Sequence, residues 1–388
     1  MNPQRIAAFP PRILKDRNPY ARLLYREMKL VGFETIDASP LKLEWLLRSR
    51  RNVEILHFHW DPQQKYVQRS PDRVTLLLRR MRRERLVPWW DVVSFVARLA
   101  AARTLGYRLV WTIHEIRPHE SDHAHHDLLA SRALARLSHL LLAHDEATAE
   151  RARDALGIPA AEIHVVPHGS YVGAYPAGRS RDVVRFELGV PTDAFVFLAF
   201  GHLRVYKELP LLLDAFASLP LPSARLIIAG APWDADMRKT VVDAAERDSR
   251  IQLMLEPVPV ESVDELFKAS DVAVFPRSDG WTSGSLILAM SMGTPVVAAR
   301  RPTYTQLIDD ETAGWLFKPG DVSSLTECLS RAASDPDEAA RKGARALTLA
   351  RGMSWAKSAA MTARLIARTD ESFVEERPIA VTSTMHGT

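Results

Sequence analysis

The 388-residue chain contains a single cysteine, Cys328. One thiol cannot form a disulfide within the chain, which excludes a disulfide-stapled secreted domain and favours a reducing compartment. The sequence has no apolar run of the length that a membrane-spanning helix needs, and it does not open with a basic segment followed by an apolar one. We therefore expect a cytoplasmic protein.

A large net charge is also absent. The 51 Lys and Arg residues stand against 47 Asp and Glu residues, and the resulting charge of +4 is too small to indicate a nucleic-acid partner. With 47% hydrophobic and 25% charged residues, the chain has the composition of a globular protein. Its length exceeds one ordinary hydrophobic core, so we expect two domains of similar size.

The first half of the sequence alternates short apolar runs with longer amphipathic stretches. This pattern predicts a parallel sheet with helices on both faces. A polar stretch that contains Gly and Arg, 175–185, predicts the linker to the second half. The expected strands are 6–9, 53–58, 108–113 and 140–143, and the expected helices are 19–31, 90–105, 127–137 and 146–156.

The second half repeats the pattern, which predicts an α/β protein of two facing, doubly wound domains with a cleft between them. We place the domains at 1–178 and 179–353, followed by a helix over 354–370 that packs back across the domains and a disordered tail at 371–388. The expected strands here are 196–200, 225–229, 251–255, 272–275 and 295–299, with helices at 213–219 and 263–269.

The most informative segment is the loop that follows the expected strand 272–275. It reads Phe-Pro-Arg-Ser-Asp-Gly-Trp-Thr-Ser-Gly-Ser from position 275 to 285 and opens an apolar helix that ends at Gly293. The backbone N–H groups of Ser283, Gly284 and Ser285 lie at the positive start of that helix, where a phosphate binds well. The loop therefore predicts a phosphate-bearing ligand.

A second loop, after the expected strand 196–200, points to the same ligand. It contains Gly201, Arg204 and Lys207, which combine a flexible backbone with a bidentate guanidinium and a point charge. Alone, such a loop is more typical of a solvated basic surface. Beside the helix start at Ser283, binding of two linked phosphates is the better interpretation.

With these residues, the second half resembles the donor domain of the GT-B nucleotide-sugar glycosyltransferases of the "glycosyl transferases group 1" type. The matching features are Gly201, Arg204, Lys207, the segment Ala-Ser-Asp-Val at 269–272 and Gly-Thr-Pro-Val-Val at 293–297. Members of that group carry two glutamates with seven residues between them, which hold the donor sugar and ribose in the retaining enzymes. Gly280 and Leu288 stand at these two positions here, so the resemblance leaves retention or inversion of the anomeric centre open.

Among these enzymes the chain is most similar to bacterial exopolysaccharide and glycolipid transferases, which have a Tyr-Lys pair and a Thr-Ser-Gly-Ser loop like those here. The resemblance implies a UDP-, GDP- or dTDP-sugar as donor, no cofactor, and no metal, because Arg204 and Lys207 would neutralise the diphosphate. Thr282, Ser283, Gly284 and Ser285 would hold phosphate, and Asp279 would contact a sugar hydroxyl. The residues expected on the sugar and nucleoside side are Asp279, Gly280, Glu256 and Pro257.

In the first half, titratable residues follow the expected strands at the edge that faces the cleft, where a general base would lie. The candidate catalytic residues are Asp61, Glu115, Glu120 and His114, and those expected on the acceptor side are Asn18, Tyr20 and His119. Strand-end histidines and tryptophans often only satisfy backbone groups, which is the alternative interpretation for this half. The His168-Gly169 pair matches a turn of the family and is more typical of a hinge.

Two further clusters stand out. His123, His125 and His126, with Asp122 and Asp127, lack a closed ligand spacing, so we expect no metal there. The basic run Arg79–Arg85, between leucines and the pair Trp89-Trp90, has the composition of an interfacial helix on an anionic membrane, although a solvated helix face is nearly as good an interpretation.

The sequence thus predicts a glycosyltransferase that moves a sugar to a glycan or polyprenyl-linked acceptor, on the inner face of the plasma membrane. Two alternatives stay open. A sugar-phosphate phosphorylase or epimerase could share the fold, but no lysine is placed for pyridoxal. The missing glutamates also allow a catalytically inactive protein that binds glycans or nucleotide sugars.

Overall fold

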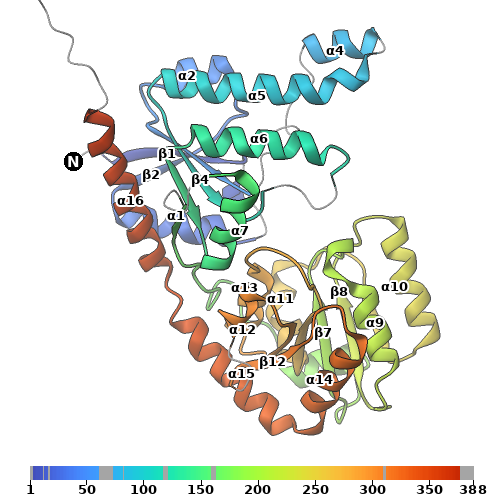
Figure 1. Ribbon diagram of the computed structural model, residues 1–388. Helices are drawn as coiled ribbons and strands as arrows, with labels where there is room; N and C mark the ends of the chain where they lie inside the picture. Colours follow the sequence, from blue (N-terminus) through green and yellow to red (C-terminus); the bar gives the residue numbers. More distant parts are fainter. Residues whose placement is uncertain are drawn as a thin grey trace, which may run out of the picture.

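The computed structural model describes residues 3–11, 13–15, 18–60, 73–81, 83–116, 121–158, 163–308 and 312–375. Two six-stranded parallel sheets form the centres of two domains (Figure 1). Both sheets are flanked by helices, as the alternating pattern predicts. Three edge strands are partly exposed, whereas the other strands are buried along all or most of their length. The chain is therefore an α/β protein of two doubly wound domains.

The first sheet has the strand order β2-β1-β3-β4-β5-β6. Its first strand pairs with β2 on one side and with β3 on the other, so the strand order reverses between β1 and β3. Its strands are β1 (Gln4–Phe9), β2 (Phe33–Asp37), β3 (Ile55–His59), β4 (Arg108–Ile113), β5 (Leu140–Ala143) and β6 (Ile163–Val165). Its helices are η1 (Ile13–Lys15), α1 (Tyr20–Leu30), α2 (Leu43–Ser49), α4 (Arg73–Arg80), η2 (Glu84–Leu86), α5 (Val87–Thr104), α6 (Ala124–Leu137) and α7 (Glu146–Leu156).

The second sheet has the order β12-β11-β10-β7-β8-β9, so its reversal lies between β7 and β10. Ligands of open α/β sheets bind at such reversals, beyond the carboxyl ends of the strands. Its strands are β7 (Val196–Phe200), β8 (Arg225–Ala229), β9 (Ile251–Met254), β10 (Val272–Phe275), β11 (Val296–Ala299) and β12 (Gly314–Phe317). Its helices are α8 (Arg181–Glu187), η4 (Val205–Lys207), α9 (Leu209–Ala217), α10 (Ala235–Arg247), α11 (Val260–Ala269), α12 (Gly284–Ser291), α13 (Pro302–Thr305), α14 (Val322–Ser334) and α15 (Pro336–Arg351).

The last helix, α16 (Trp355–Glu375), leaves the second domain and packs along α1 of the first (Figure 1). Its first residue fixes the crossing point, because the Trp355 indole nitrogen donates a hydrogen bond to the Ser170 carbonyl at 2.6 Å. A Cβ on Gly169 would lie 2.2 Å from the Trp355 ring, so the turn at this position has no room for a side chain. The chain thus crosses between the domains twice, once before α8 and once before α16, and the two crossings are in contact with each other.

Two expected boundaries are wrong. The helix α16 continues to Glu375, so residues 371–375, expected in a disordered tail, are helical; residues 376–388 lie outside the described part. The expected linker 175–185 contains the start of α8, which begins at Arg181. Arg181 and Arg185 both pair with Asp271, so these arginines of the expected linker are held by a carboxylate of the second domain.

Candidate active site

Two loops meet beyond the carboxyl ends of the neighbouring strands β7 and β10. Gly201 follows β7 with φ of 93°, a backbone conformation that favours glycine. A Cβ at this position would lie 3.2 Å from Lys207 Nζ, so glycine leaves space for the lysine to turn back along the strand. The Lys207 amine then donates a hydrogen bond to the Phe200 carbonyl at 3.1 Å.

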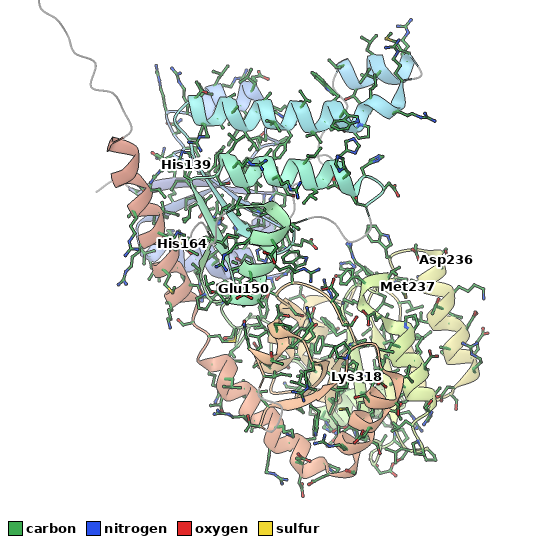
Figure 2. All side chains as sticks on the ribbon, viewed as in Figure 1. His139, Glu150, His164, Asp236, Met237 and Lys318 are labelled. Atoms are coloured by element: carbon green, nitrogen blue, oxygen red, sulfur yellow. The ribbon has the colours of Figure 1, made fainter. Side chains whose placement is uncertain are left out.

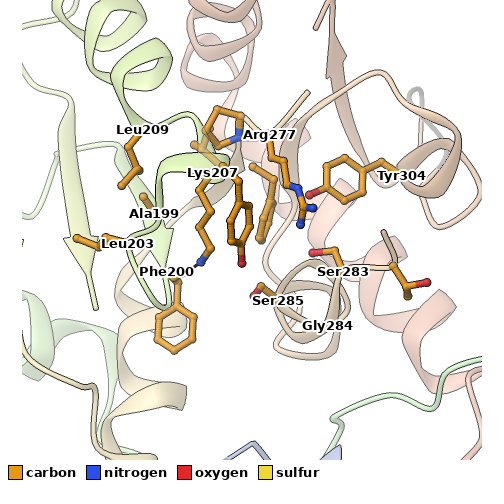
Figure 3. Close-up of a pocket in the computed structure, with 15 residues that line it drawn as sticks. Ala199, Phe200, Leu203, Lys207, Leu209, Arg277, Ser283, Gly284, Ser285 and Tyr304 are labelled. Carbon is orange, nitrogen blue, oxygen red and sulfur yellow. Dashed lines mark hydrogen bonds between the residues drawn. The ribbon is translucent and has the colours of Figure 1, made fainter. Parts of the chain in front are cut away.

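The loop after β10 ends at the first residues of α12. Ser283 caps this helix by accepting a hydrogen bond from the Leu286 backbone N–H at 3.3 Å. Figure 3 shows Lys207 and Arg277 approaching the start of α12 from two sides. A cavity of about 140 Å³ lies between them, lined among others by Phe200, Tyr206, Lys207, Arg277, Thr282, Ser283, Gly284, Ser285 and Tyr304. We call it the donor cavity.

Positive charge is concentrated in the donor cavity. Burial, together with the charges of Arg277 and Arg204, lowers the pKa of the Lys207 amine to about 8. Burial and the nearby Arg301 also lower the pKa of the Arg277 guanidinium. Cations that repel one another in a buried place favour an anionic ligand, because an anion relieves both the desolvation and the repulsion.

Arg277 was missed by the sequence reasoning, although it lies in the segment 275–285 that was singled out. Its Nε donates to the Asp279 backbone carbonyl, and its guanidinium lies 4.4 Å above the centre of the Tyr206 ring. The available signal was a cation two residues beyond a buried strand, at an edge where ligands bind.

Three other predicted donor residues lie away from this cavity. The Arg204 guanidinium stacks over the Trp233 ring at 4.2 Å and is not among the residues that line the cavity. The Glu256 side chain is 86% exposed and lies 3.7 Å from Arg238. Neither Glu256 nor Pro257 lines the donor cavity.

A second cavity, of about 160 Å³, adjoins the first and reaches into the first domain. We call it the acceptor cavity. Four residues that the sequence placed on the acceptor or catalytic side all line it: Asn18, Tyr20, His114 and Glu115. The other lining residues are Trp60, His168, Tyr171, Tyr206, Arg277, Trp281, Thr282 and Gly284.

His114 and His168 line the acceptor cavity, and their rings pack against those of the buried His59 and His144. Burial lowers the pKa of His114 well below its ordinary value, and neighbouring histidines lower it further. The Tyr20 hydroxyl lies 3.0 Å from His144 Nε2, and the Tyr25 hydroxyl lies 2.8 Å from both His57 and His59. A histidine held neutral can accept or donate a hydrogen bond but contributes no charge to the cavity.

The donor loop is tied to the first domain. Trp281 is buried among the core side chains of the first domain, under the guanidinium of Arg151 at 4.6 Å. The Asp145 carboxylate accepts a hydrogen bond from the Thr282 hydroxyl, and Thr148 lies 3.0 Å from the same hydroxyl.

Asp279 belongs to the same set of contacts between the domains. Its carboxylate pairs with both terminal nitrogens of Arg151, one of them at 2.8 Å. Asp279 was expected to contact a sugar hydroxyl. The structure instead places its carboxylate against an arginine of α7.

Several predicted residues lie outside the described part of the chain, namely Asp61, His119 and Glu120. The basic run Arg79–Arg85 was expected to form one interfacial helix. It does not, since α4 ends at Arg80 and η2 begins at Glu84. Among the residues that the structure describes, no group of three or more His, Cys, Asp or Glu side chains is arranged to hold a metal ion. In the same part of the chain, no helix has the length and apolar character to cross a bilayer.

Another cavity, of about 470 Å³, lies away from both loops. His139 and His164 line it, and Figure 2 shows both on the side of the first domain that carries α16. His139 precedes β5, so this cavity is at the opposite edge of the sheet from the donor loop. Its position separates it from the donor cavity and the acceptor cavity.

Two family models match the chain in succession. The model described as Glycosyltransferase Family 4 matches residues 20–170, and the model described as Glycosyl transferases group 1 matches residues 180–347. These ranges fall on the two sheets, and the second contains the whole donor cavity.

Characterised relatives share part of this sequence. A GDP-mannose:glycolipid 4-beta-D-mannosyltransferase of Xanthomonas campestris pv. campestris is 25% identical over 302 residues, which is 78% of this chain and 75% of that enzyme. A D-inositol 3-phosphate glycosyltransferase of Corynebacterium kroppenstedtii is 31% identical over 207 residues, which is 51% of this chain and 46% of that enzyme.

Solved structures share the fold at low identity. The crystal structure of Anabaena HepE in complex with UDP and glucose matches with a TM-score of 0.68 at 18% identity, covering 95% of this chain and 100% of the other. Sucrose-phosphate synthase of Thermosynechococcus elongatus matches with a TM-score of 0.70 at 16% identity and the same coverage. With the two family models and the paired doubly wound domains, the chain belongs to the group 1 glycosyltransferases and has a GT-B fold.

Proposed function

We propose that this protein transfers a hexose from a nucleoside-diphosphate donor to a hydroxyl of a glycan or lipid-linked acceptor. The observation that carries the proposal is the convergence of Lys207, Arg277 and the start of α12 on one cavity that adjoins the acceptor cavity. Lys207 and the start of α12 would stabilise the negative charge that develops on the diphosphate as the glycosidic bond breaks. The Xanthomonas relative, whose name gives GDP-mannose and a glycolipid, supports this class of substrates.

The acceptor cavity supplies a base for a direct displacement. Glu115 is the one carboxylate among the described residues that line this cavity, and an attacking hydroxyl must lose its proton as it forms the new bond. Gly280 and Leu288 offer no carboxylate at the two positions where the retaining enzymes hold the donor sugar and ribose. We therefore assign Glu115 as the general base of an inverting reaction, which product anomer analysis by NMR tests.

Substitutions of Lys207 and Glu115 test the proposed donor binding and the proposed general base. Lys207→Ala should abolish donor binding in calorimetry, whereas Glu115→Gln should bind the donor and lose transfer by about 10²–10⁴-fold. Lys239→Ala, at an exposed lysine paired with Asp243, is the matched control and should behave as the wild type. Unchanged turnover in Lys207→Ala would overturn the proposal.

The same experiment separates the proposal from an inactive binding protein. A protein that only binds nucleotide sugars would show donor affinity in the wild type without transfer to any acceptor. We further propose that Lys207 and the start of α12 replace a divalent ion at the diphosphate, so that excess EDTA leaves the rate of transfer unchanged. A rate that falls with EDTA and returns with Mg²⁺ would contradict this part.

A surface for a lipid-linked acceptor lies on the first domain. There α4 and the adjoining end of α5 project from the body of the domain (Figure 1). Exposed apolar side chains gather on α4, η2 and α5 and alternate with arginines, which suits the interface of an anionic bilayer. The apolar residues are Leu76, Leu77, Met81, Leu86, Trp89 and Val93, and the exposed arginines include Arg80, Arg83 and Arg85. We propose that this surface binds an anionic membrane.

Liposome flotation tests the membrane surface. The wild type should float with vesicles that contain anionic lipid, and replacing Leu77 and Trp89 by Ser should abolish flotation. Phe186→Ser, at a side chain of the second domain that is 85% exposed, is the matched control. Equal flotation of all three proteins, or no flotation of the wild type, would contradict the proposal.

A further inference from the structure

The donor cavity and the acceptor cavity share four lining residues: Tyr206, Arg277, Thr282 and Gly284. In the proposed reaction the acceptor hydroxyl attacks the sugar carbon that carries the diphosphate, so the transferred sugar must lie where the two cavities join. Arg277 is the one charged side chain among these four. The transferred sugar would therefore lie against a guanidinium.

Arg277 also occupies the space of a side chain at position 280. Gly280 has φ of 150°, and a Cβ on it would lie 2.1 Å from Arg277 Cζ. A side chain at position 280 would therefore have to displace the guanidinium of Arg277 from its present place. This chain has exchanged the carboxylate that the family resemblance implies at position 280 for a group of opposite charge.

The exchange reverses the chemistry of recognition. A carboxylate accepts hydrogen bonds from neutral sugar hydroxyls, whereas a guanidinium can only donate, and its planar fork matches a carboxylate. Glu115 acts on the Arg277 guanidinium from the acceptor side, but less strongly than the positive Arg301, while Asp279 is paired with Arg151 and the histidine His114 is held neutral. The buried Arg301 adds a further positive charge beside Arg277.

We propose that Arg277 is a specificity-determining residue and that the donor is a nucleoside diphosphate of a sugar acid, a hexuronate, whose carboxylate binds the Arg277 guanidinium. This inference rests on the proposed function, because it assumes a nucleoside-diphosphate sugar in the donor cavity. It adds the class of sugar, which neither the family models nor the relatives name for this chain.

Pairs of donors that differ only in oxidation at carbon 6 test the inference. Calorimetry with UDP-glucose and UDP-glucuronate, UDP-galactose and UDP-galacturonate, and GDP-mannose and GDP-mannuronate gives a discrimination ratio for each pair at fixed ionic strength. We expect the uronate of one pair to bind at least about tenfold more tightly than its neutral partner, since a charge-assisted hydrogen bond is worth that much. In Arg277→Gln this ratio should fall to near one.

The outcomes separate the two proposals. If a nucleoside diphosphate binds but the wild type prefers the neutral sugar, or shows no preference, the hexuronate is wrong and the proposed function stands. If Arg277→Gln weakens both members of a pair equally and keeps their ratio, Arg277 holds the diphosphate instead, which also overturns the inference. If neither nucleoside diphosphates nor their sugars bind, the proposed function itself fails. Melting temperatures of wild type and variant show that both are folded in these measurements.

Discussion

Lys207 is a buried amine whose charge depends on pH in the range where an enzyme is assayed. Its pKa of about 8 follows from burial and from the charges of Arg277 and Arg204. Below this value the free protein holds an ammonium group that attracts the donor diphosphate, and above it the amine is neutral. The burial that lowers the pKa of Lys207 therefore also determines the pH range in which its positive charge can attract the donor.

We predict that donor affinity is nearly constant up to about pH 7.5 and falls above pH 8, because binding to the neutral form requires uptake of a proton. Calorimetry from pH 7 to 9.5 measures the effect. Lys207→Arg keeps its charge over this range, so its affinity should not fall. The same decline in both proteins would assign the pH dependence to another group.

The residues of the site differ in how far the sequence could place them. Lys207, Ser283, Asn18 and Glu115 follow strands at the edge where parallel sheets bind ligands, and the structure places all four on the two cavities. The orientation of a long side chain depends instead on neighbours distant in sequence. Arg204 lies over Trp233 and away from the cavity, which no spacing in the sequence could indicate.

At the scale of elements, the apolar strands were predicted well because they are buried on both faces. The edge strands β2 and β12 and the helices α10, α14 and α15 were not expected. The edge strand β2, with the sequence Phe-Glu-Thr-Ile-Asp, is partly exposed and carries polar residues, so its apolar signal is weak in the sequence. The edge strand β12, with the sequence Gly-Trp-Leu-Phe, is buried, but its apolar run is only three residues long.

The helix α7 connects fold stability to the donor loop through its N-cap residue, Asp145. Asp145 caps α7 by accepting a hydrogen bond from the Thr148 backbone N–H at 2.7 Å, and its second oxygen accepts from the Thr282 hydroxyl. One carboxylate thus caps the N-terminus of a helix of the first domain and holds Thr282, which lines both cavities. Loss of this carboxylate should therefore affect both the stability of the fold and the position of the donor loop.

We predict that Asp145→Ala lowers the free energy of unfolding by about 1 kcal/mol and also raises the donor KM several-fold, because loss of a helix cap costs about that much and the loop loses its anchor. Asp234→Ala is the matched control, since Asp234 caps α10 in the same way, at 2.7 Å from the Met237 backbone N–H. Urea unfolding should show that the two variants lose an equal amount of unfolding free energy. A donor KM that rises equally in both variants would contradict the role of Asp145.

At the scale of the whole molecule, the neutral histidines make folding sensitive to acid. Burial lowers the pKa of His57 and of His168 from 6.5 to about 3 in the folded protein. The unfolded chain therefore binds protons at these residues below about pH 6.5, where the folded protein does not. Stability is fully present above pH 6.5 and is lost as the pH falls toward 3.

We predict that acidification from pH 7.5 to 5.5 lowers the free energy of unfolding by about 1.4 kcal/mol for each of these two histidines. Urea unfolding at several pH values measures the slope. His57→Gln should be less stable at neutral pH, since His57 bonds to Tyr25 and Thr112, but its stability should fall less steeply with acid. Equal slopes in both proteins would show that other groups, such as carboxylates, cause the loss.

The close approach of Arg277 and Gly280 also affects how this site can change by substitution. Gly280→Glu alone would force a side chain against the guanidinium and into a backbone conformation that only glycine adopts readily. The guanidinium would have to swing aside and the loop would have to relax before an acidic residue at position 280 is tolerated. In laboratory evolution toward an acidic residue at position 280, Gly280→Glu should therefore be accommodated better when Arg277 is shortened in the same variant.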